Sequence, residues 1–431
     1  MQKVSKKSMR FHSAPYLLAG AVVLFLGGVY FVRARTVLPT LQLRPIVYDT
    51  KIPIEKNGNT VEAPPVPVIP AVEHVQTPAG MKSIYMSQCY ASMPNLRKKL
   101  IAIADTTEVN SIIVDIKDYT GTISHPITGT VLKRGGKGCK VEDMRELVKE
   151  MHAHNIYVIG RITVFQDPYM ADLRPEWAVK SKSRADGIWR DKKGLAFIDV
   201  GAKGYWDYVV ELSKQSHALG FDELNYDYIR FPSDGNMKDA VYSHSTEGTK
   251  ADNLEKFFQY LTRSVRTEAK DPVSGHVPKL SADVFGMVAT NKDDLTIGQV
   301  LERTVPYFDY TVPMVYPSHY PSGFNGYKNP NLNAYGVIKF SMDKAVARLK
   351  SETTTVPGFM HTPVEGQPGV YKKPTYDPKK LRTWIQDFDY GGNYGPKEVR
   401  EQFQATYDAG LDSWMIWSPS NRYTLEALHK E

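Results

Sequence analysis

The sequence is poor in cysteine, with only Cys89 and Cys139 among its 431 residues. No CxxC pair occurs, so the spacing typical of many zinc sites and dithiol redox sites is absent. Each cysteine lies near the end of a predicted strand or in the loop after it, and two cysteines in an exported domain are able to form one disulfide. The sequence leaves two alternatives open, a single bridge or two unpaired thiols.

Acidic residues are missing from positions 1–35, which hold six lysine and arginine residues. The formal net charge of the chain is +7, so this segment supplies nearly all of it. A nucleic-acid-binding protein usually carries its positive charge on one face of a folded domain. The glycine-rich stretch "RGGKGCK", residues 134–140, lacks the GK[ST] ending of a nucleotide-binding P-loop. We therefore expect neither nucleic acid nor a nucleotide as a partner.

Charge is also absent from nineteen consecutive residues, "APYLLAGAVVLFLGGVYFV", positions 14–32. As a helix this run would be about 28 Å long, close to the roughly 30 Å of a membrane's hydrocarbon core. Basic residues precede the run, which favours an N-terminus in the cytoplasm. We expect residues 1–35 to form a cytoplasmic stub and a single transmembrane signal anchor in the cytoplasmic (inner) membrane. The alternative is a cleaved signal peptide and a secreted protein; both place the remainder outside the cytoplasm.

Residues 36–78 are predicted to be a proline-rich extracytoplasmic linker. Their stretch "EAPPVPVIPAVEHVQTP", positions 62–78, shows no helical period, which is typical of an extended spacer. The folded domain is then expected over residues 79–431.

Short apolar runs alternate with amphipathic stretches from Lys82 onward. Eight such strand–helix units are predicted, and eight parallel strands favour a closed (β/α)8 TIM barrel of the α/β class. An open doubly wound sheet is the alternative. The length in excess of a typical barrel is expected in the loops after the third and fourth strands and in an irregular insertion at about residues 353–380. The strand candidates are "KSIYMSQCY", "SIIVDIKDY", "IYVIGRITVF", "FDELNYDY", "KLSADVFGMVA", "DYTVPMVYPSHY", "LRTWIQDF" and "SWMIWSPS".

Polar side chains are predicted to gather at the C-terminal ends of these strands, where TIM barrels have their active sites. Side chains alternate along a strand, so the apolar face identifies the opposite one. The predicted positions are Asp115 and Lys117 on the second strand, Arg161 on the third, Glu223, Asn225 and Asp227 on the fourth with Arg230 after it, Asp283 on the fifth, Tyr316 and His319 at the end of the sixth, Trp384 and Gln386 (or Asp387, in the other phase) on the seventh, and Trp417 on the eighth.

Asp227 and Asp283 end neighbouring strands, which favours them as a catalytic pair. Glycoside hydrolysis uses one ionised carboxyl group to attack or stabilise the sugar cation and one protonated group for the leaving oxygen. We predict that Asp227 and Asp283 share these two roles, with the other positions binding substrate and the aromatic rings stacking on sugars. The alternative is a salt-bridged polar barrel core, for instance with Asp115–Arg161 or Glu223–Lys117 pairs.

Six segments resemble, in the same order, a bacterial family of glycoside hydrolase barrels distantly similar to the alpha-amylase clan. They are "VDIKDYTG", "FDELNYDYIRFPSDG", "SADVFG", "VPMVYPSHY", "WIQDF" and "WMIWSPSNRYT". The resemblance implies hydrolysis of glycosidic bonds, with Asp227, Asp283 and Asp387 at the positions of the nucleophile, the acid and a third carboxylate. Two departures occur: Asn225 stands where amylase-like barrels usually have arginine, and the acid is aspartate rather than glutamate.

Two other functions compete with hydrolysis of an extracytoplasmic polysaccharide. A non-catalytic barrel that binds glycans would need the same aromatic rings, and a lyase would use Lys117 as a Schiff-base amine. We expect no metal and no cofactor, because His152 and His154 lie two apart on a predicted helix and face different directions. No ligand spacing joins the remaining histidines near strand ends, which are His125, His319 and His361.

Overall fold

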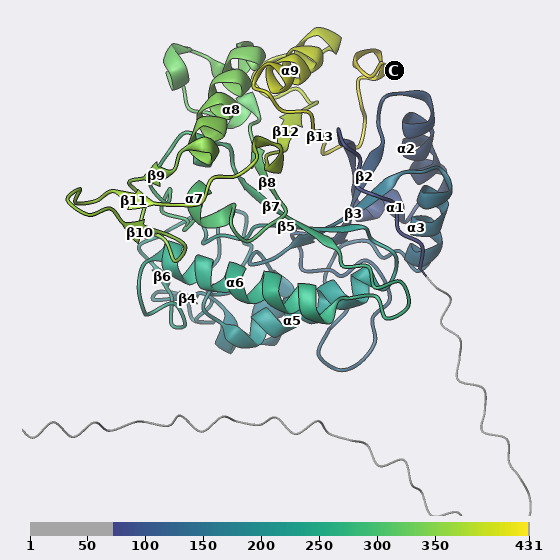
Figure 1. Ribbon diagram of the computed structural model, residues 1–431. Helices are drawn as coiled ribbons and strands as arrows, with labels where there is room; N and C mark the ends of the chain where they lie inside the picture. The colour runs from purple at the N-terminus through teal and green to yellow at the C-terminus, as the bar shows by residue number, and fades with distance from the viewer. Residues whose placement is uncertain (1–71, 430–431) are drawn as a thin grey trace, which may run out of the picture. The chain divides into compact units, whose positions relative to one another are not determined.

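The computed structural model describes residues 72–429. Eight parallel strands close into a barrel in the order β1–β13–β12–β8–β7–β5–β3–β2, which confirms the predicted (β/α)8 architecture (Figure 1). The sheet closes because β1 pairs with β2 on one side and with β13 on the other, so the open-sheet alternative is wrong. The barrel strands are β1 (Lys82–Met86), β2 (Ser111–Lys117), β3 (Tyr157–Thr163), β5 (Glu223–Asp227), β7 (Lys279–Phe285), β8 (Tyr310–Met314), β12 (Thr383–Gln386) and β13 (Trp414–Trp417).

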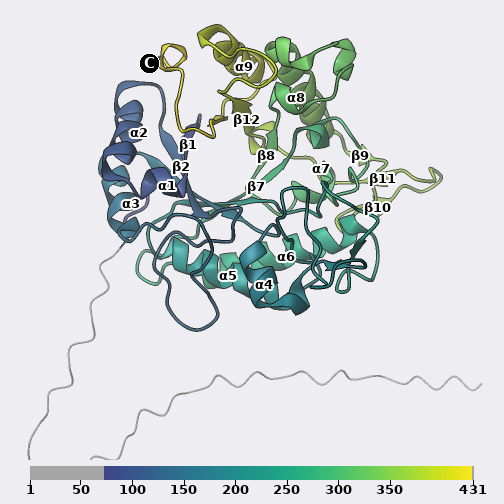
Figure 2. The same ribbon diagram turned by 180° about the vertical axis from the view of Figure 1, so that it is seen from behind.

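Helices cover the outside of the barrel and bury one apolar stripe each. Figures 1 and 2 show α5 and α6 side by side over one part of the sheet, and α8 and α9 side by side over another. Local sequence fixes the helix starts: α6 begins with a capping box between Thr249 and Asp252, which satisfies backbone donors of the first turn. The helices are α1 (Gln88–Ala91), α2 (Pro94–Thr106), α3 (Met144–Ala153), α4 (Pro168–Leu173), α5 (Lys203–His217), α6 (Lys250–Glu268), α7 (Leu301–Thr304), α8 (Ala334–Lys350) and α9 (Pro396–Asp408).

The barrel interior is filled by side chains, so the barrel is a packed core and not a channel. Its apolar part is a cluster of inward residues on several strands, among them Ile113, Ile159 and Val312. Below this cluster, at the N-terminal end of the strands, Glu223 accepts two hydrogen bonds from Arg382 Nη1, at 2.8 and 2.9 Å. The functional end of the barrel is therefore the opposite one.

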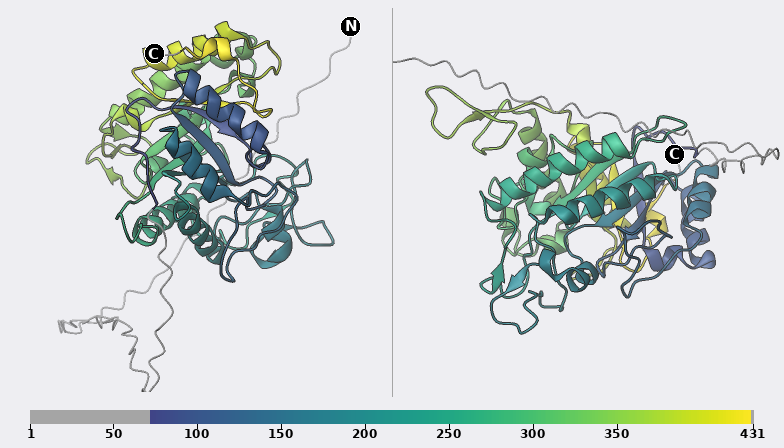
Figure 3. Two further views of the ribbon diagram at one scale, coloured as in Figure 1. Left: turned by 90° about the vertical axis from the view of Figure 1, so that its right-hand side faces the viewer. Right: turned by 90° about the horizontal axis from the view of Figure 1, so that it is seen from below.

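The extra chain length forms small sheets in the loops. In the loops after β3 and β5, β4 (Lys180–Ser181) pairs antiparallel with β6 (Ala240–Val241), which ties two neighbouring loops together. The insertion predicted as irregular holds a three-stranded sheet of β9 (Thr353–Thr354), β10 (Thr362–Pro363) and β11 (Tyr371–Lys372). Figure 3 shows this insertion extending away from the barrel.

The two cysteines form a disulfide between Cys89 and Cys139. Cys89 lies in α1, directly after β1, and Cys139 lies in the loop between β2 and α3. The bridge therefore joins the loops that follow the first two strands at the C-terminal end of the barrel. Of the two alternatives that the sequence leaves open, the single bridge is therefore correct and the pair of free thiols is wrong.

Residues 72–78, which the sequence assigns to the linker, lie against the N-terminal end of the barrel. Val75 N donates to Asp222 Oδ1 at 2.9 Å, and Thr77 Oγ1 donates to the hydroxyl of Tyr157 at 3.2 Å. The rest of the predicted linker and the predicted anchor at residues 14–32 fall outside the described residues. Between residues 72 and 429, no helix has the length and apolar character that crossing a membrane requires.

Candidate active site

A cavity of about 350 Å³ lies at the C-terminal ends of the barrel strands. Its walls come from the ends of β3, β5, β7, β8, β12 and β13 and from the loops that follow them. The lining residues are Arg161, Asp227, Tyr228, Arg230, Phe285, Gly286, Met287, Met314, Tyr316, His319, Tyr320, Trp384 and Trp417. Seven of the fourteen predicted site residues are among them.

Arg161 on β3 is a buried cation that joins two carboxylates. Its Nη1 donates to Asp115 Oδ1 at 2.7 Å, and its Nη2 donates to Asp227 Oδ2. Asp115 lies behind Arg161 and also accepts a hydrogen bond from Tyr85. Burial alone would lower the pKa of Arg161, but the charges of Asp227 and Asp115 raise it well above its usual value. Arg161 therefore stays charged, and an adjacent cation favours the ionised form of a carboxyl group.

Asp227 is presented to the cavity by a strained turn. It is the last residue of β5, and the next residue, Tyr228, has a φ of 50°. This left-handed conformation costs a non-glycine residue about 1–2 kcal/mol. The turn lets Tyr228 N donate to Asp227 Oδ1 at 2.5 Å and places Tyr228 on the cavity wall. Strain of this kind is typical of sites where side-chain direction matters for function.

Asp283 on β7 lies below the cavity floor and is fully buried. Tyr226 and Ala282, which precede Asp227 and Asp283, are register partners, so the two aspartates occupy neighbouring positions one residue further along. Asn225 Nδ2 donates to Asp283 Oδ1 at 2.9 Å, and Asp283 Oδ2 has no hydrogen-bond partner among the described residues. Burial and, next, the charge of Asp227 raise the pKa of Asp283 well above its usual value, against the opposing effect of Arg161. These surroundings favour the protonated form of Asp283.

Arg230 carries a second positive charge into the cavity. Its Nη1 donates to Phe231 O at 3.0 Å and to Ser233 Oγ at 3.2 Å. Its guanidinium lies 4.9 Å from the ring centre of Tyr228 and 4.7 Å from that of Phe285. In the described part of the chain, no carboxylate lies within salt-bridge distance of it. Arg230 also lines a smaller cavity of about 100 Å³, which shares Tyr228 with the larger one.

Aromatic rings form the remaining wall. Trp417 lies 4.2 Å from Tyr85 and 5.9 Å from Trp384 between ring centres, and Arg161 lies over the Trp417 ring at 5.4 Å. Trp384 Nε1 is buried and has no hydrogen-bond partner among the described residues. Tyr316 and His319 stand edge to face with ring centres 5.4 Å apart, and burial lowers the pKa of His319. Flat rings with scattered donors suit the apolar faces and hydroxyl groups of sugars.

Lys117 does not reach the cavity. The β2–β3 register shifts between Asp115 and Lys117, so the simple alternation on which its predicted orientation depends breaks at this point. Lys117 Nζ lies 2.8 Å from Asp167 Oδ2 and donates to the hydroxyl of Tyr205, on α5, at 3.0 Å. Burial lowers the pKa of Lys117, and Asp167 opposes this effect. The amine is enclosed between sheet and helix, so a Schiff base with a substrate in the cavity is not supported.

Five other predicted positions also lie outside the cavity lining, in addition to Asp283. Asp115 and Asn225 support Arg161 and Asp283 from below, and Glu223 pairs with Arg382 deep in the barrel, not with Lys117. Gln386 Oε1 accepts from Ser318 Oγ at 2.6 Å, which braces the loop after β8. Asp387 accepts from Thr424 Oγ1 at 2.7 Å and from Thr424 N at 2.8 Å, so it fixes the segment after β13.

The prediction missed several side chains that shape the cavity and its floor, among them the four discussed here. Tyr85 alternates with the buried Ile84 and Met86 on β1, and this pattern would have identified it as inward. Met314 is the last residue of β8 in the same phase as Val312. Tyr228 and Phe285 follow the expected catalytic aspartates, but the turn at Tyr228 has no signal in the sequence because left-handed backbone is rare for tyrosine.

The chain belongs to a protein family described as "Putative glycosyl hydrolase domain", whose family model matches residues 83–423. No curated protein sequence matches the chain. A hypothetical protein from Ruminiclostridium thermocellum ATCC 27405 is 31% identical over 47% of this chain and 97% of that chain, with a TM-score of 0.39.

Two solved structures of low identity share the fold. The glycoside hydrolase domain of PgaB (BpsB) from Bordetella bronchiseptica has a TM-score of 0.55 at 12% identity, covering 82% of this chain and 100% of that chain. Alpha-L-fucosidase isoenzyme 2 from Paenibacillus thiaminolyticus has a TM-score of 0.50 at 12% identity, covering 81% of this chain and 48% of that chain. Family and fold together identify an enzyme of the glycoside hydrolase class with a carbohydrate substrate.

Proposed function

We propose that this enzyme hydrolyses a glycosidic bond of an extracytoplasmic polysaccharide by a two-carboxylate mechanism, with Asp227 as the nucleophile and Asp283 as the acid/base. The observation that carries the proposal is the opposite environment of two neighbouring aspartates. Asp227 faces the cavity beside the Arg161 cation, whereas Asp283 is buried and its pKa is raised well above the usual value. Glycosidases assign acid and nucleophile roles to two carboxyl groups through such a difference in surroundings.

The backbone positions of the pair allow the short carboxyl separation of a retaining enzyme, which is the form of the mechanism that we propose. The two aspartates are inward residues at neighbouring positions of adjacent parallel strands, which lie about 4.8 Å apart. Retaining glycosidases separate their carboxyl groups by about 5–5.5 Å, and inverting ones by about 6.5–9.5 Å.

In the retaining reaction that we propose, every proton and bond is accounted for. The Asp227 carboxylate attacks the anomeric carbon while Asp283 gives its proton to the departing glycosidic oxygen. The Asp283 carboxylate then takes a proton from water, which attacks the glycosyl–Asp227 ester and restores both groups.

The shape of the site supports a polymeric substrate. The smaller cavity shares Tyr228 and Arg230 with the larger one, so the two are neighbours and together offer space for more than one sugar residue. Trp384 Nε1 and the unpaired side of the Arg230 guanidinium offer donors for sugar oxygens.

We also propose that the enzyme is anchored in the cytoplasmic membrane by residues 14–32, with its barrel outside. The Cys89–Cys139 disulfide supports an extracytoplasmic location, because such bonds persist in oxidising compartments. Sodium carbonate extraction and the mass of the purified chain test the anchor: an uncleaved chain stays in the membrane pellet. A soluble chain that begins after residue 32 would instead support signal cleavage and secretion.

The catalytic roles are tested with Asp227→Asn and Asp283→Asn, using Asp343→Asn on the outer face of α8 as the control. Cell-wall and storage polysaccharides are screened for new reducing ends, and synthetic aryl glycosides of the identified sugar follow. Asp227→Asn should lose activity on both substrate types. Asp283→Asn should lose it on the polysaccharide; an aryl glycoside whose leaving group needs no proton should still release one equivalent of the aryl alcohol in a burst, and added azide, which needs no base, should restore turnover.

Three outcomes would contradict the proposal. If Asp227→Asn still cleaves the polysaccharide, Asp227 is not the nucleophile. The absence of both the burst and the azide rescue on the aryl glycoside in Asp283→Asn would make that residue a positioning residue for Asp227 and not the acid/base. Tight binding of a glycan without any cleavage by the wild type would favour the non-catalytic binding barrel.

A further inference from the structure

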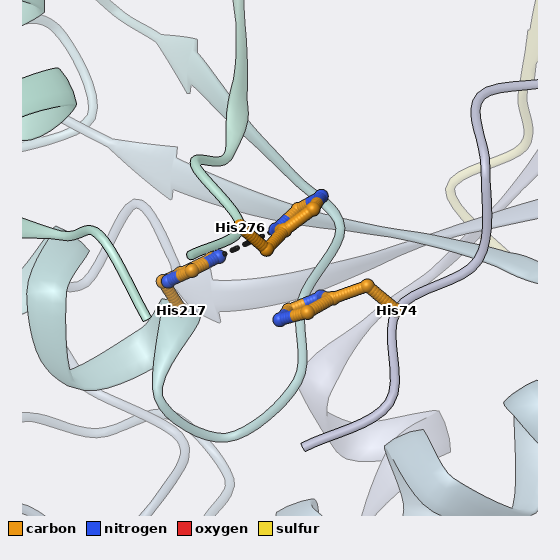
Figure 4. Close-up of side chains that lie close together, drawn as sticks. All are labelled: His74, His217 and His276. Atoms are coloured by element: carbon orange, nitrogen blue, oxygen red, sulfur yellow. Dashed lines mark hydrogen bonds between the residues drawn. The ribbon is translucent and has the colours of Figure 1, made fainter. Parts of the chain in front are cut away.

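Three histidines from distant parts of the sequence meet at the N-terminal end of the barrel, opposite the cavity. His74 lies in the segment before β1, His217 is the last residue of α5, and His276 lies in the loop between α6 and β7. Figure 4 shows the three rings facing one another. One ring nitrogen from each histidine lies within 4.8 Å of the other two. We propose that these residues form a binding site for a divalent transition metal, with Zn²⁺ as the expected ion.

The imidazole of His74 is prepared to act as a ligand. Its Nδ1 lies 3.3 Å from Asp222 Oδ1, and because an ionised carboxylate only accepts hydrogen bonds, the ring proton belongs on Nδ1. The lone pair is then on Nε2, which is buried and has no hydrogen-bond partner among the described residues. A carboxylate behind a ligating histidine is a usual arrangement in metal sites, because it fixes the tautomer and the ring orientation.

Asp222 is itself rigidly held. It accepts hydrogen bonds from Val75 N at 2.9 Å and from Val158 N at 2.8 Å, and its Oδ2 lies 3.0 Å from His152 Nε2. This carboxylate therefore cannot swing away from His74 without breaking backbone contacts on two segments. His152 takes part as a neighbour of Asp222 and not as a fourth ligand.

His217 and His276 supply the other two nitrogens. His217 Nε2 lies 2.9 Å from His276 Nδ1, so a single proton is shared between two nitrogens. Around tetrahedral Zn²⁺ with Zn–N bonds of about 2.0–2.1 Å, ligand nitrogens lie roughly 3.3–3.4 Å apart. A metal ion would replace this proton and change the distance between His217 Nε2 and His276 Nδ1 only slightly. His74 Nε2 would have to move toward these two nitrogens to complete the site.

The rings are stacked, and metal binding would tilt them. The ring centres of His74 and His276 are 3.8 Å apart, with an angle of 15° between the planes. Imidazole nitrogen is a ligand that suits Zn²⁺, Ni²⁺ and Cu²⁺ and does not suit Mg²⁺ or Ca²⁺. The cluster offers three protein ligands within residues 72–429, so a water molecule would take the fourth position.

The location indicates a structural role for the metal. In TIM barrels the catalytic residues lie at the C-terminal face, and residues at the N-terminal face serve stability. A bound ion would fasten the segment before β1 to α5 and to the α6–β7 loop, in addition to the ring stacking and the His217–His276 hydrogen bond that join them now. It would thereby fix the place where the chain enters the barrel.

The test uses the full chain, without an affinity tag and purified in detergent. After treatment with a chelator and dialysis against ZnCl2, metal content is measured by mass spectrometry, and Co²⁺ absorption reports the coordination. The variants are His74→Ala and His276→Ala, with His154→Ala as the control because this exposed histidine lies on the same face and pairs with Asp105. Circular dichroism checks that each variant is folded.

We expect one Zn²⁺ per chain in the wild type and in His154→Ala, a visible Co²⁺ band, and a metal-dependent rise in Tm. His74→Ala and His276→Ala should bind at least about 10-fold more weakly and lose the Tm response, by comparison with the 10–100-fold loss for residues that only support a ligand. X-ray absorption on the zinc-loaded wild type should show nitrogen and oxygen neighbours with imidazole scattering. Absence of stoichiometric zinc in the wild type, or equal zinc in all variants, would overturn the proposal.

Discussion

Asp283 illustrates how a single buried carboxyl group can serve chemistry at the expense of stability. Its side chain is fully buried, one oxygen has no partner among the described residues, and Asp227 is its neighbour. Because its pKa is raised in the folded state, the fold holds this proton more tightly than the unfolded chain does. The stabilising effect is complete below the unfolded pKa of about 3.9 and is lost as pH rises through the folded pKa.

We therefore expect the free energy of unfolding to fall above pH 4 by up to about 1.4 kcal/mol per pH unit because of this group. Asp283→Asn should remove that slope and raise Tm at neutral pH, although it lowers polysaccharide hydrolysis. Denaturant unfolding between pH 4 and pH 8 measures the effect, with Asp343→Asn as the control. An unchanged slope in Asp283→Asn would show that the folded-state pKa of Asp283 is close to its ordinary value.

Tyr228 allows a second test at the scale of one residue. Glycine is usually less stable than alanine by about 0.5–1 kcal/mol, because it has more freedom in the unfolded chain. At the φ of 50° found here the order should be reversed, since alanine keeps the left-handed strain and glycine does not. We expect Tyr228→Gly to be about 1 kcal/mol more stable than Tyr228→Ala in urea unfolding. The usual order, with alanine more stable, would contradict the strained turn.

At the scale of elements, the strands were predictable and the details of their ends were not. Short apolar runs between amphipathic stretches identified all eight barrel strands, because parallel strands are buried on both faces and leave a strong signal. The alternation rule also brought Arg161 and Asp227 to one cavity. It failed at Lys117, where the strand register shifts and the side chain turns toward α5. A register shift depends on contacts with the neighbouring strand, so its position cannot be derived from one strand alone.

The disulfide is an element-scale constraint on the loops around the cavity. It closes a loop of 50 residues between α1 and the segment before α3. Such a loop is expected to contribute about 2–4 kcal/mol, chiefly by restricting the unfolded chain. The double variant Cys89→Ser/Cys139→Ser should lose this amount in guanidinium unfolding, and wild type unfolded in the presence of a reductant should show the same loss. Equal stability of oxidised and reduced wild type would contradict this expectation.

At the scale of the whole molecule, the barrel and the carboxylates follow from local patterns, whereas the histidine cluster does not. His74 precedes the barrel, and His217 and His276 lie 59 residues apart, so no short motif connects them. Closure of the barrel is what brings their segments together. Residues that only the tertiary fold brings together cannot be recognised as one site from their spacing in the sequence.

Residues 72–78 enter the barrel at the end opposite the mouth of the cavity. These residues enter at the N-terminal ends of the strands, and the cavity opens at the C-terminal ends. Enzyme coupled to a bead or a sensor chip at residues 72–78 would therefore present its open mouth to the bulk solution. Such a surface should accept polymers too large to diffuse beneath the protein, whereas coupling through the loops around the cavity should block them.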